Sequence, residues 1–250
     1  MKHVIVTGAS RGIGAAVTQA AAGENTIIHA ISRSQNDIAW EKARTQGAEV
    51  IHYSCDLTNA ESADKTLADI FHTHLPASGD TWVLINNAGM VSPVAPAGQA
   101  ESNEIQHSLR VNVEAPLLLA NRFTQALQAV DAFKMVINVS SGAGKQPITS
   151  WSSYCAAKAA VDMYTKTAGL EQKENEHPVY FTAFAPGIVD TDMQSHIRSH
   201  SEDTFAHVDQ FRAYKENNQL LAPETVAKAL LRLIESPPEN GALTDVQTYL

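Results

Sequence analysis

Short runs of apolar and β-branched residues recur along the chain, each long enough for a strand and too short for a typical helix. They read HVIVT (3–7), TIIHAIS (26–32), EVIHYSCD (49–56), WVLINNAG (82–89), KMVINVSS (134–141), VYFTAFAP (179–186) and ALTDVQTY (242–249). Runs of this kind are typical of strands buried on both faces. The pattern predicts about seven such strands.

Segments with helical spacing of their apolar positions separate these runs. They cover residues 60–74, 101–130, 152–173 and 223–235, and a further helix is expected to open at the glycines that follow the first strand. Alternation of strand and helix favours right-handed crossovers, which build a parallel sheet with helices on both faces. No repeat, low-complexity tract or long Pro/Gly linker interrupts the pattern. We therefore predict one α/β domain over residues 1–250 with a Rossmann-like, doubly wound parallel sheet.

Residues 190–221 depart from this alternation. They are polar and weakly periodic, and they lie between the sixth strand and the last long helix. Sheets of this kind bind ligands at the carboxyl ends of their strands, where a long connection can cover the site. The segment 190–221 is therefore predicted to be a substrate lid.

Charge and cysteine content narrow the kind of partner. The formal net charge is −9, from 27 acidic against 18 basic residues, which disfavours binding to nucleic acid or to an anionic membrane. No apolar run approaches the ~20 residues of a membrane helix. Two cysteines, Cys55 and Cys155, do not make a disulfide framework, and the ten histidines form no metal-like cluster. We expect a cytoplasmic protein with no metal ion.

The first turn, TGASRGIG, places Gly8, Gly12 and Gly14 between a strand and a helix. Glycine permits a tight turn and close backbone approach, and the start of a helix offers free N–H groups to a pyrophosphate. The spacing differs from the G-x-G-x-x-G fingerprint, so this motif alone is compatible with a dinucleotide site or with an ordinary turn.

The end of the second strand bears on the choice between NADH and NADPH. An NAD-binding fold would place an acid there to hold the ribose diol, but this chain has Ser32 and Arg33. Together with Arg11, they offer two guanidiniums for a 2′-phosphate, which favours NADPH. The alternative is that both arginines are solvated surface charges. Asp37 is interpreted as a first-turn helix residue.

The third and fourth strands end in polar residues at the same predicted edge. Asp56 could accept a hydrogen bond from the adenine amino group, or it could cap a turn. Gly89, at the end of NNAG, would let the chain pass close to the cofactor. Asn86 could equally be a structural amide that ties strands together.

Six motifs in order carry a resemblance to a known family. The chain resembles the short-chain dehydrogenase/reductase family in the order and spacing of these motifs, over nearly its whole length. The motifs are TGASRGIG, NNAG, Asn112 in LRVNVEAP, NVSSGAG, YCAAK and APGIVDT. WSSYCAAKAAVDM and APGIVDTDMQ are similar to segments of the sepiapterin reductases and the bacterial benzil reductases. The resemblance implies an NADPH-dependent carbonyl reductase.

Ketone reduction needs hydride at carbon and a proton at oxygen, so an acid must lie beside the carbonyl. Tyr154 is the proposed acid, and Lys158 lies on the same helix face four residues later. A nearby cation stabilises the phenolate, so we expect Lys158 to lower the pKa of Tyr154. The resemblance implies that Lys158 also holds the nicotinamide ribose.

The resemblance assigns further roles. Ser141, thirteen residues before Tyr154, matches the serine that hydrogen-bonds the substrate oxygen, with Ser140 as the neighbour that could be mistaken for it. Asn112 would bind a water that links Lys158 to solvent. The expected cofactor contacts are Gly8, Ser10, Arg11, Gly12, Ile13, Gly14, Ser32, Arg33, Asp56, Leu57, Asn87, Ala88, Gly89, Tyr154, Lys158, Pro186, Gly187, Val189 and Thr191. Each of these residues also has a purely structural interpretation.

Candidate substrate contacts come from the tryptophan before the catalytic tyrosine and from the lid. Trp151 and Met193, with Phe205, Phe211 and Tyr214, could line an apolar pocket, although core packing explains any one of them equally well. Asp245 matches an aspartate that anchors the pterin in sepiapterin reductases, but it could simply face water.

The sequence thus predicts reduction of an aromatic vicinal diketone such as benzil to (S)-benzoin with NADPH. Reduction of a pterin side-chain ketone, as in sepiapterin reductases, is the alternative. A non-catalytic protein that senses NADP(H) is the alternative from another class, and the presence of Asn112, Ser141, Tyr154 and Lys158 argues against it. By resemblance, a homodimer or homotetramer is expected, formed through helices in 101–130 and 152–173.

Overall fold

A computed structural model describes all residues, 1–250, and contains one seven-stranded sheet. Every neighbouring pair of strands is parallel, in the order β3-β2-β1-β4-β5-β6-β7. The strands are β1 (Lys2–Thr7), β2 (Thr26–Ser32), β3 (Glu49–Ser54), β4 (Thr81–Asn86), β5 (Phe133–Val139), β6 (Tyr180–Ala185) and β7 (Ala242–Asp245). The predicted fold class and all seven strands are confirmed.

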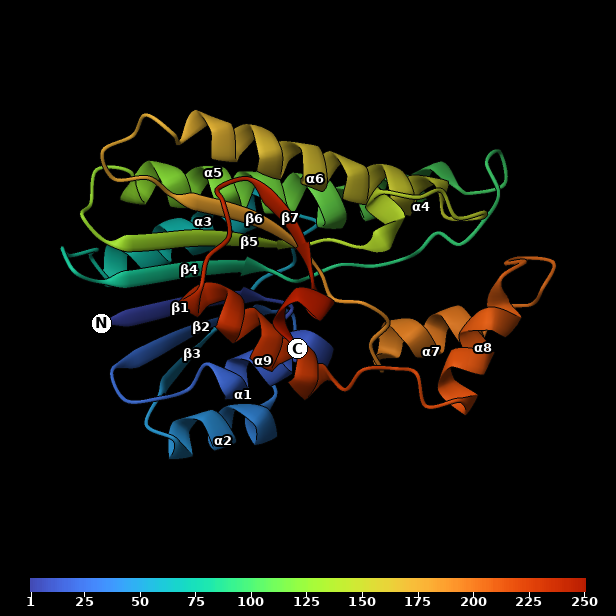
Figure 1. Cartoon of the computed structure of the whole chain (residues 1–250), viewed down its shortest axis with the longest axis horizontal. Helices are drawn as coiled ribbons and strands as arrows, with labels where there is room; N and C mark the ends of the chain where they lie inside the picture. Colours follow the sequence, from blue (N-terminus) through green and yellow to red (C-terminus); the bar gives the residue numbers. More distant parts are fainter.

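Nine α-helices connect and cover the strands. They are α1 (Gly12–Ala20), α2 (Asp37–Thr45), α3 (Ala60–Thr73), α4 (Ser102–Leu109), α5 (Ala115–Leu127), α6 (Ser152–Glu171), α7 (Asp192–Arg198), α8 (Val208–Glu216) and α9 (Pro223–Glu235). Figure 1 shows α1, α2 and α9 on one face of the sheet and α3, α5 and α6 on the other. None of these helices is both long and apolar enough to cross a membrane.

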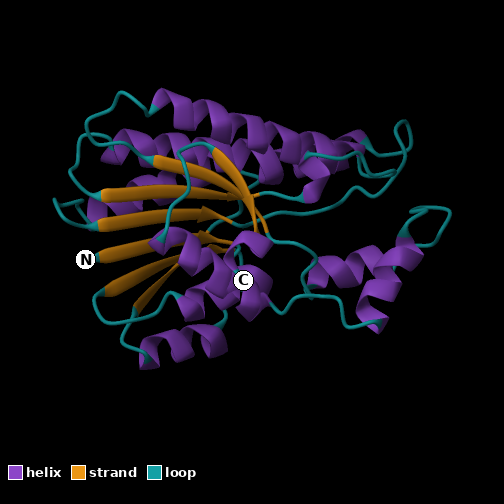
Figure 2. Cartoon of the chain, viewed as in Figure 1, coloured by secondary structure: helices purple, strands orange, loops and turns teal.

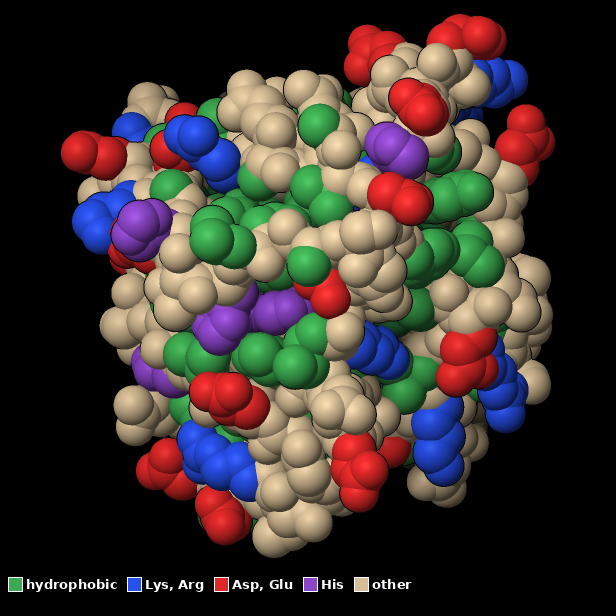
Figure 3. All heavy atoms as spheres, turned by 90° about the vertical axis from the view of Figure 1, so that its left-hand side faces the viewer, with side chains coloured by type: hydrophobic (Ala, Val, Ile, Leu, Met, Phe, Trp, Pro, Cys, Tyr) green, Lys and Arg blue, Asp and Glu red, His purple; other side chains and the backbone are tan.

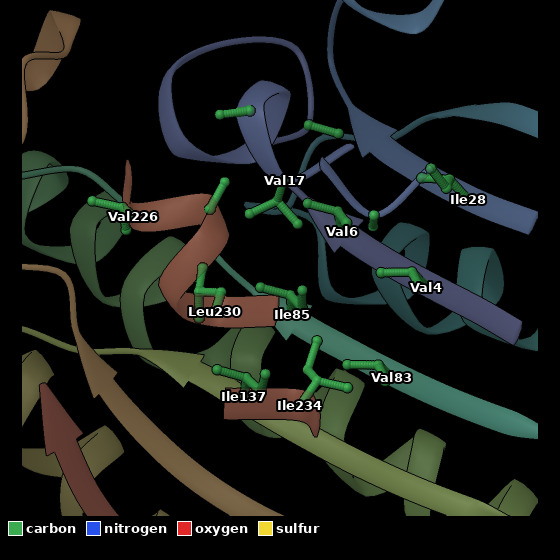
Figure 4. Close-up of a cluster of buried hydrophobic side chains, with 14 of the residues drawn as sticks. Val4, Val6, Val17, Ile28, Val83, Ile85, Ile137, Val226, Leu230 and Ile234 are labelled. Atoms are coloured by element: carbon green, nitrogen blue, oxygen red, sulfur yellow. The ribbon is translucent and has the colours of Figure 1, made fainter. Parts of the chain in front are cut away.

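Each face of the sheet has its own hydrophobic core. On one face, Val17 of α1 and Leu230 and Ile234 of α9 point toward Val6 and Ile85 of the sheet (Figure 4). On the other face, residues of α3 and α5, such as Leu67 and Phe123, pack on β4 and β5. Burial on both faces explains why the strands have nearly continuous apolar sequences.

The helix predicted over 101–130 is interrupted. A π-helical turn, Arg110–Glu114, separates α4 from α5. Pro116 has no N–H and so cannot donate to the carbonyl of Asn112, four residues earlier, which disfavours a continuous α-helix at this point. The interruption falls on Asn112, one of the predicted site residues.

The segment 190–221 forms an excursion from the sheet that contains α7 and α8. Its two ends are joined, since the Asp190 N–H donates to the Leu221 carbonyl (2.9 Å) and the Leu221 N–H donates to the Ile188 carbonyl (2.8 Å). Both helices lie beyond the arrowheads of the strands, which mark their carboxyl ends (Figure 2). This is the edge at which the ligand is expected.

Histidine side chains gather on the face toward the opposite, amino ends of the strands (Figure 3). Beneath the surface, the buried rings of His3 and His29 lie with their Nδ1 and Nε2 atoms 3.2 Å apart, and His29 Nδ1 lies 3.3 Å from the Tyr53 hydroxyl. His3 also stacks on Trp82 at 3.8 Å. Burial lowers the pKa of His3 to about 4 and that of His29 to about 3. Both rings are therefore neutral in the folded protein near pH 7.

This cluster predicts a loss of stability in acid. The folded pKa values lie below the ordinary value of 6.5, so the stabilisation is complete above about pH 6.5 and is lost as the pH falls toward 4. For His29 alone the loss between pH 7 and pH 4 is on the order of 3 kcal/mol. In urea unfolding at a series of pH values, His29→Gln should show a shallower dependence than the parent. His72→Gln, at an exposed position of α3, should match the parent. Parallel curves for His29→Gln and the parent would contradict the assignment.

Candidate active site

A cavity of about 640 Å³ opens at the carboxyl ends of the strands. Its wall includes most of the residues predicted to hold a cofactor: Gly8, Ser10, Arg11, Gly12, Ile13, Ser32, Arg33, Asp56, Leu57, Asn87, Ala88, Gly89, Tyr154, Lys158, Pro186 and Thr191. Sequence positions more than 180 residues apart therefore meet at one edge of the sheet. Gly14, Gly187 and Val189 do not line the cavity.

The glycine turn has no room for a side chain at position 14. A Cβ on Gly14 would lie 2.2 Å from the Gly8 carbonyl oxygen, and Gly8 itself has a φ of +66°. The end of β4 fixes the turn from beneath, because Asn87 Nδ2 donates to the Thr7 carbonyl (2.8 Å). The start of α1 at Gly12 thus faces the cavity with free N–H groups, an arrangement that fits a pyrophosphate.

One end of the cavity lies over β2 and β3. The Ser32 hydroxyl donates to the Ser34 carbonyl (2.7 Å), while Arg33 is exposed, lines the cavity and makes no hydrogen bond or ion pair. Asp56 lines the same end, and its Oδ1 accepts from the N–H and the hydroxyl of Thr58 (3.0 and 2.9 Å). These two hydrogen bonds lower the pKa of Asp56, so the group is a carboxylate there.

Arg11 forms an ion pair with the segment 190–221. Its guanidinium lies 3.1 Å from the carboxylate of Asp192, at the start of α7, and both side chains are exposed. The ion pair joins the glycine turn to the segment 190–221 across the cavity. An exposed pair of this kind contributes little to stability, so Arg11 can exchange it for a phosphate at small cost.

Tyr154 and Lys158 lie one turn apart on α6, and both are almost fully buried while lining the cavity. The Lys158 ammonium lies 5.7 Å from the centre of the Tyr154 ring and donates to the Val139 carbonyl at the end of β5 (2.8 Å). The predicted pairing of phenol and ammonium on one helix face is present in the structure.

The pKa values differ from the expectation. Burial raises the pKa of Tyr154 to about 12, and its hydrogen bond with Ser141 acts in the opposite direction. Burial also lowers the pKa of Lys158 to about 8. The prediction that Lys158 gives the phenol a lowered pKa is therefore wrong, because burial dominates and Lys158 is not among the groups that shift this pKa. A phenol with this pKa is fully protonated at pH 7 and can donate its proton.

The two neighbouring serines differ in their contacts. Ser141 is the partner of Tyr154, and its Oγ also accepts from the Ala143 N–H (3.2 Å). Ser140 lines the cavity, but its hydroxyl donates to Asp162 behind the wall (2.5 Å). Ser140 thus lies in the cavity wall with its hydroxyl bound to Asp162, whereas Ser141 lies outside the wall beside Tyr154, and the assignment of Ser141 as the catalytic serine stays a prediction.

Asn112 lies behind the cavity with all its side-chain groups engaged. Nδ2 donates to the Met90 carbonyl (2.8 Å) and to Ser108 Oγ (3.1 Å), and Oδ1 accepts from the Met90 N–H (3.0 Å). It borders Gly89, whose other neighbour is the Lys158 ammonium. The amide therefore fixes the loop after β4.

The predicted substrate residues are only partly at the cavity. Met193 lines it, whereas Trp151 is buried in a separate apolar cluster, where it stacks on Phe205 (5.2 Å between ring centres) and meets the edge of Tyr154 (5.6 Å). Phe205 and Phe211 belong to that cluster too and do not line the cavity. These aromatic residues anchor the segment 190–221 to α6, which corrects the prediction that they form the pocket surface.

Asp245 also lies away from the cavity wall. It is exposed at the end of β7 and accepts a hydrogen bond from the Gln247 N–H (3.0 Å), as the cap of a short 3₁₀ helix. This exposed position matches the alternative interpretation of Asp245, a carboxylate that faces water.

Several residues of the wall were missed by sequence reasoning. They are Met90, Val91 and Ser92 after β4, His107 and Val111 beside the π turn, and Asp192 and His196 of α7. Ser92 Oγ and His196 Nε2 lie 2.9 Å apart, so they bridge the loop after β4 and the segment 190–221. The position of Met90 to Ser92, directly after a strand end, was a signal that could have identified them.

Comparison with known proteins agrees with this geometry. The family profile described as short chain dehydrogenase matches residues 2–202. The chain belongs to the short-chain dehydrogenase family. It is 38% identical over 250 residues to a benzil reductase ((S)-benzoin forming) of Bacillus subtilis, with 100% of both chains covered. It is 28% identical to a sepiapterin reductase of Xenopus tropicalis over 246 residues, covering 93% of this chain and 90% of that protein.

Among solved structures, a short chain dehydrogenase/reductase of Saccharomyces cerevisiae superimposes with a TM-score of 0.82 at 27% identity, covering 98% of this chain and 96% of that one. This short-chain dehydrogenase is thus an oxidoreductase that acts on carbonyl or hydroxyl groups of a small molecule. Enzymes of the family use NAD(P)(H), and the tight glycine turn at the cavity fits such a dinucleotide.

Replacing Tyr154 by Phe tests the proposed acid. The change removes the proton donor and keeps the ring, so turnover of a reactive ketone should fall by at least ~10² while dinucleotide affinity stays largely intact. Steady-state rates and fluorescence titration measure the two effects. Tyr164→Phe, on the same helix but packed on Phe181 away from the cavity, is the control and should keep parent activity. Near-normal turnover in Tyr154→Phe would exclude Tyr154 as the acid.

Proposed function

We propose that this enzyme is an NADPH-dependent reductase of aromatic vicinal diketones that converts benzil to (S)-benzoin. The observation that carries the proposal is the pair Tyr154 and Lys158, which are buried one turn apart in the wall of the same cavity as the glycine turn. A non-catalytic sensor would have no need to keep a buried lysine and a buried phenol together, because both cost free energy to bury.

In the proposed reaction the bound dinucleotide supplies a hydride to the carbonyl carbon. Tyr154 donates its phenolic proton to the carbonyl oxygen, so that the phenol O–H bond breaks as the alcohol O–H bond forms. Ser141, a hydrogen-bond partner of Tyr154, also donates to that oxygen as negative charge builds there. Lys158 stabilises the phenolate until a proton from solvent restores it, and it orients the ribose of the dinucleotide.

The preference for NADPH rests on the end of the cavity over β2. Arg33 is exposed at the wall with no competing partner, and Arg11 has only an exposed ion pair to give up. Asp56, the acid at this end, is held by Thr58 beyond the end of β3, and Asp37 lies in the first turn of α2 outside the wall. This arrangement favours a 2′-phosphate over a ribose diol.

Arg33→Asp should reverse the cofactor preference. The parent should bind NADPH at least tenfold more tightly than NADH, since one charge-assisted contact contributes roughly 1.5–3 kcal/mol. The substitution removes that contact and adds repulsion, so NADH should become the tighter ligand in fluorescence titration. Lys42→Asp makes the same charge change on α2 outside the cavity and should keep the parent preference. Equal affinities of the parent for both dinucleotides would refute the proposal.

The substrate class follows from reactivity and from the wall beside Tyr154. In a vicinal diketone each carbonyl activates the other toward hydride, and the first reduction removes that activation. A site that works by orientation and one acid should therefore stop at the hydroxyketone. Met90, Val91 and Met193 give the wall apolar surface suited to an aryl group, with Ser92 and His196 as polar neighbours.

Benzil and 1-phenyl-1,2-propanedione should each give one hydroxyketone enantiomer with NADPH, (S)-benzoin in the case of benzil. Chiral chromatography of the products and kcat/KM values for benzil and sepiapterin measure this. Because Asp245 caps a 3₁₀ helix away from the wall, Asp245→Asn should leave both kcat/KM values within about twofold. Racemic product, or efficient sepiapterin reduction that Asp245→Asn abolishes, would indicate a pterin reductase instead.

We also propose that the protein assembles as a homodimer or homotetramer through the face of α4 and α6. Leu109, Met163 and Leu170 are large apolar side chains exposed on these two helices, and Met163 and Leu170 are each more than half exposed. Burial against a second copy would remove them from water. A cytoplasmic location, with Cys55 and Cys155 both free, stays a prediction.

A further inference from the structure

Two charged side chains of α6 hold the chain where it leaves β5. Lys158 donates to the Val139 carbonyl (2.8 Å), and one helical turn later Asp162 accepts from the hydroxyl of the next residue, Ser140 (2.5 Å). The Ser140 N–H donates in turn to the Phe184 carbonyl of β6 (2.9 Å). Ser141, the partner of Tyr154, follows directly, so its position depends on this double attachment.

Asp162 is almost fully buried and only partly satisfied. Its Oδ1 has the Ser140 hydroxyl, but its Oδ2 is buried with no hydrogen-bond partner. The loop packs closely against it, since a Cβ on Gly144 would lie 2.9 Å from Oδ2 and 3.0 Å from the Lys158 carbonyl oxygen. A buried carboxylate in this state is costly unless its charge interacts with an opposite charge.

The charges around Asp162 identify that partner. On α6, Lys158 lies one turn before Asp162 and Lys166 lies one turn after it. Lys145 follows the loop that packs on Asp162. Lys145 and Lys166 are exposed. Lys158 is the buried one of the three, and among charged groups Asp162 is the one that raises the pKa of Lys158 against the effect of burial. All three cations lower the pKa of Asp162, Lys145 more than Lys158, but Lys158 is the one of the three whose own pKa Asp162 raises.

We propose that Asp162 is a positioning residue of the catalytic site, which keeps Lys158 charged and holds the β5 exit so that Ser141 reaches Tyr154. This proposal rests on the roles proposed above for Tyr154 and Lys158. Without the carboxylate, burial alone would act on Lys158 and the fraction of ammonium near neutral pH would fall. The enzyme would then lose the cation that stabilises the phenolate and orients the ribose.

Asp162→Asn is nearly isosteric and can still accept from Ser140, so it removes mainly the charge. The expected result is that the alkaline limb of the pH profile of kcat/KM for benzil reduction moves toward lower pH by about one unit. The alkaline limb of NADPH affinity, measured by fluorescence without any ketone, should move in the same direction. Glu171→Gln removes one charge from an exposed position of the same helix and should leave both profiles unchanged.

Ser140→Ala provides a second test if Asp162→Asn does not fold. It removes the hydrogen bond that holds the β5 exit and leaves the charge of Asp162 in place, so kcat for a reactive ketone should fall while both alkaline limbs stay where they are in the parent. A purely structural Asp162 would lower thermal stability, or lower the rate equally at all pH values, with both alkaline limbs in place. That result in Asp162→Asn would overturn the proposal, and so would an unchanged kcat in Ser140→Ala. The profile of NADPH affinity decides the matter even if benzil is not a substrate.

Discussion

The contact between the Lys158 ammonium and the Val139 carbonyl connects the helix that carries the acid to the strand that leads to the serine. It joins α6 to the end of β5 at 2.8 Å, inside the protein. Tyr154 lies one turn before this contact on the helix, and Ser141 lies two residues after it on the strand side. The relative placement of acid and serine therefore depends on this buried cation together with the Asp162 contact that follows it.

Burial sets the chemistry of this site as much as the identity of its residues does. Loss of solvent raises the pKa of Tyr154 and lowers that of Lys158, so the phenol is held protonated and the ammonium is close to losing its charge. The same desolvation strengthens every remaining interaction between charges in the site. A buried lysine and a buried phenol are thus favourable for proton donation to a ketone, provided that the lysine keeps its proton.

Much of the fold could be predicted from the sequence because the strands are buried on both faces, and their sequences are therefore nearly continuous apolar runs. Most of the cavity wall could also be predicted, because the carboxyl ends of parallel strands lie at one edge of the sheet and the residues that follow them meet there. Interactions that depend on three-dimensional burial could not be read in this way. Three features depend on burial in this way: the pKa of Tyr154, the packing of Trp151 against Phe205 and the π turn at Asn112. The partner of Arg11 is Asp192, 181 residues later, and no local pattern indicates it.

The most direct test is an experimental structure of the enzyme with NADP⁺ and benzoin bound in the same molecule. The account predicts the alcohol oxygen within hydrogen-bonding distance of the Tyr154 and Ser141 hydroxyls, Lys158 on the nicotinamide ribose, and Arg33 on the 2′-phosphate. A dinucleotide bound away from the glycine turn, or an alcohol oxygen directed away from Tyr154, would contradict it.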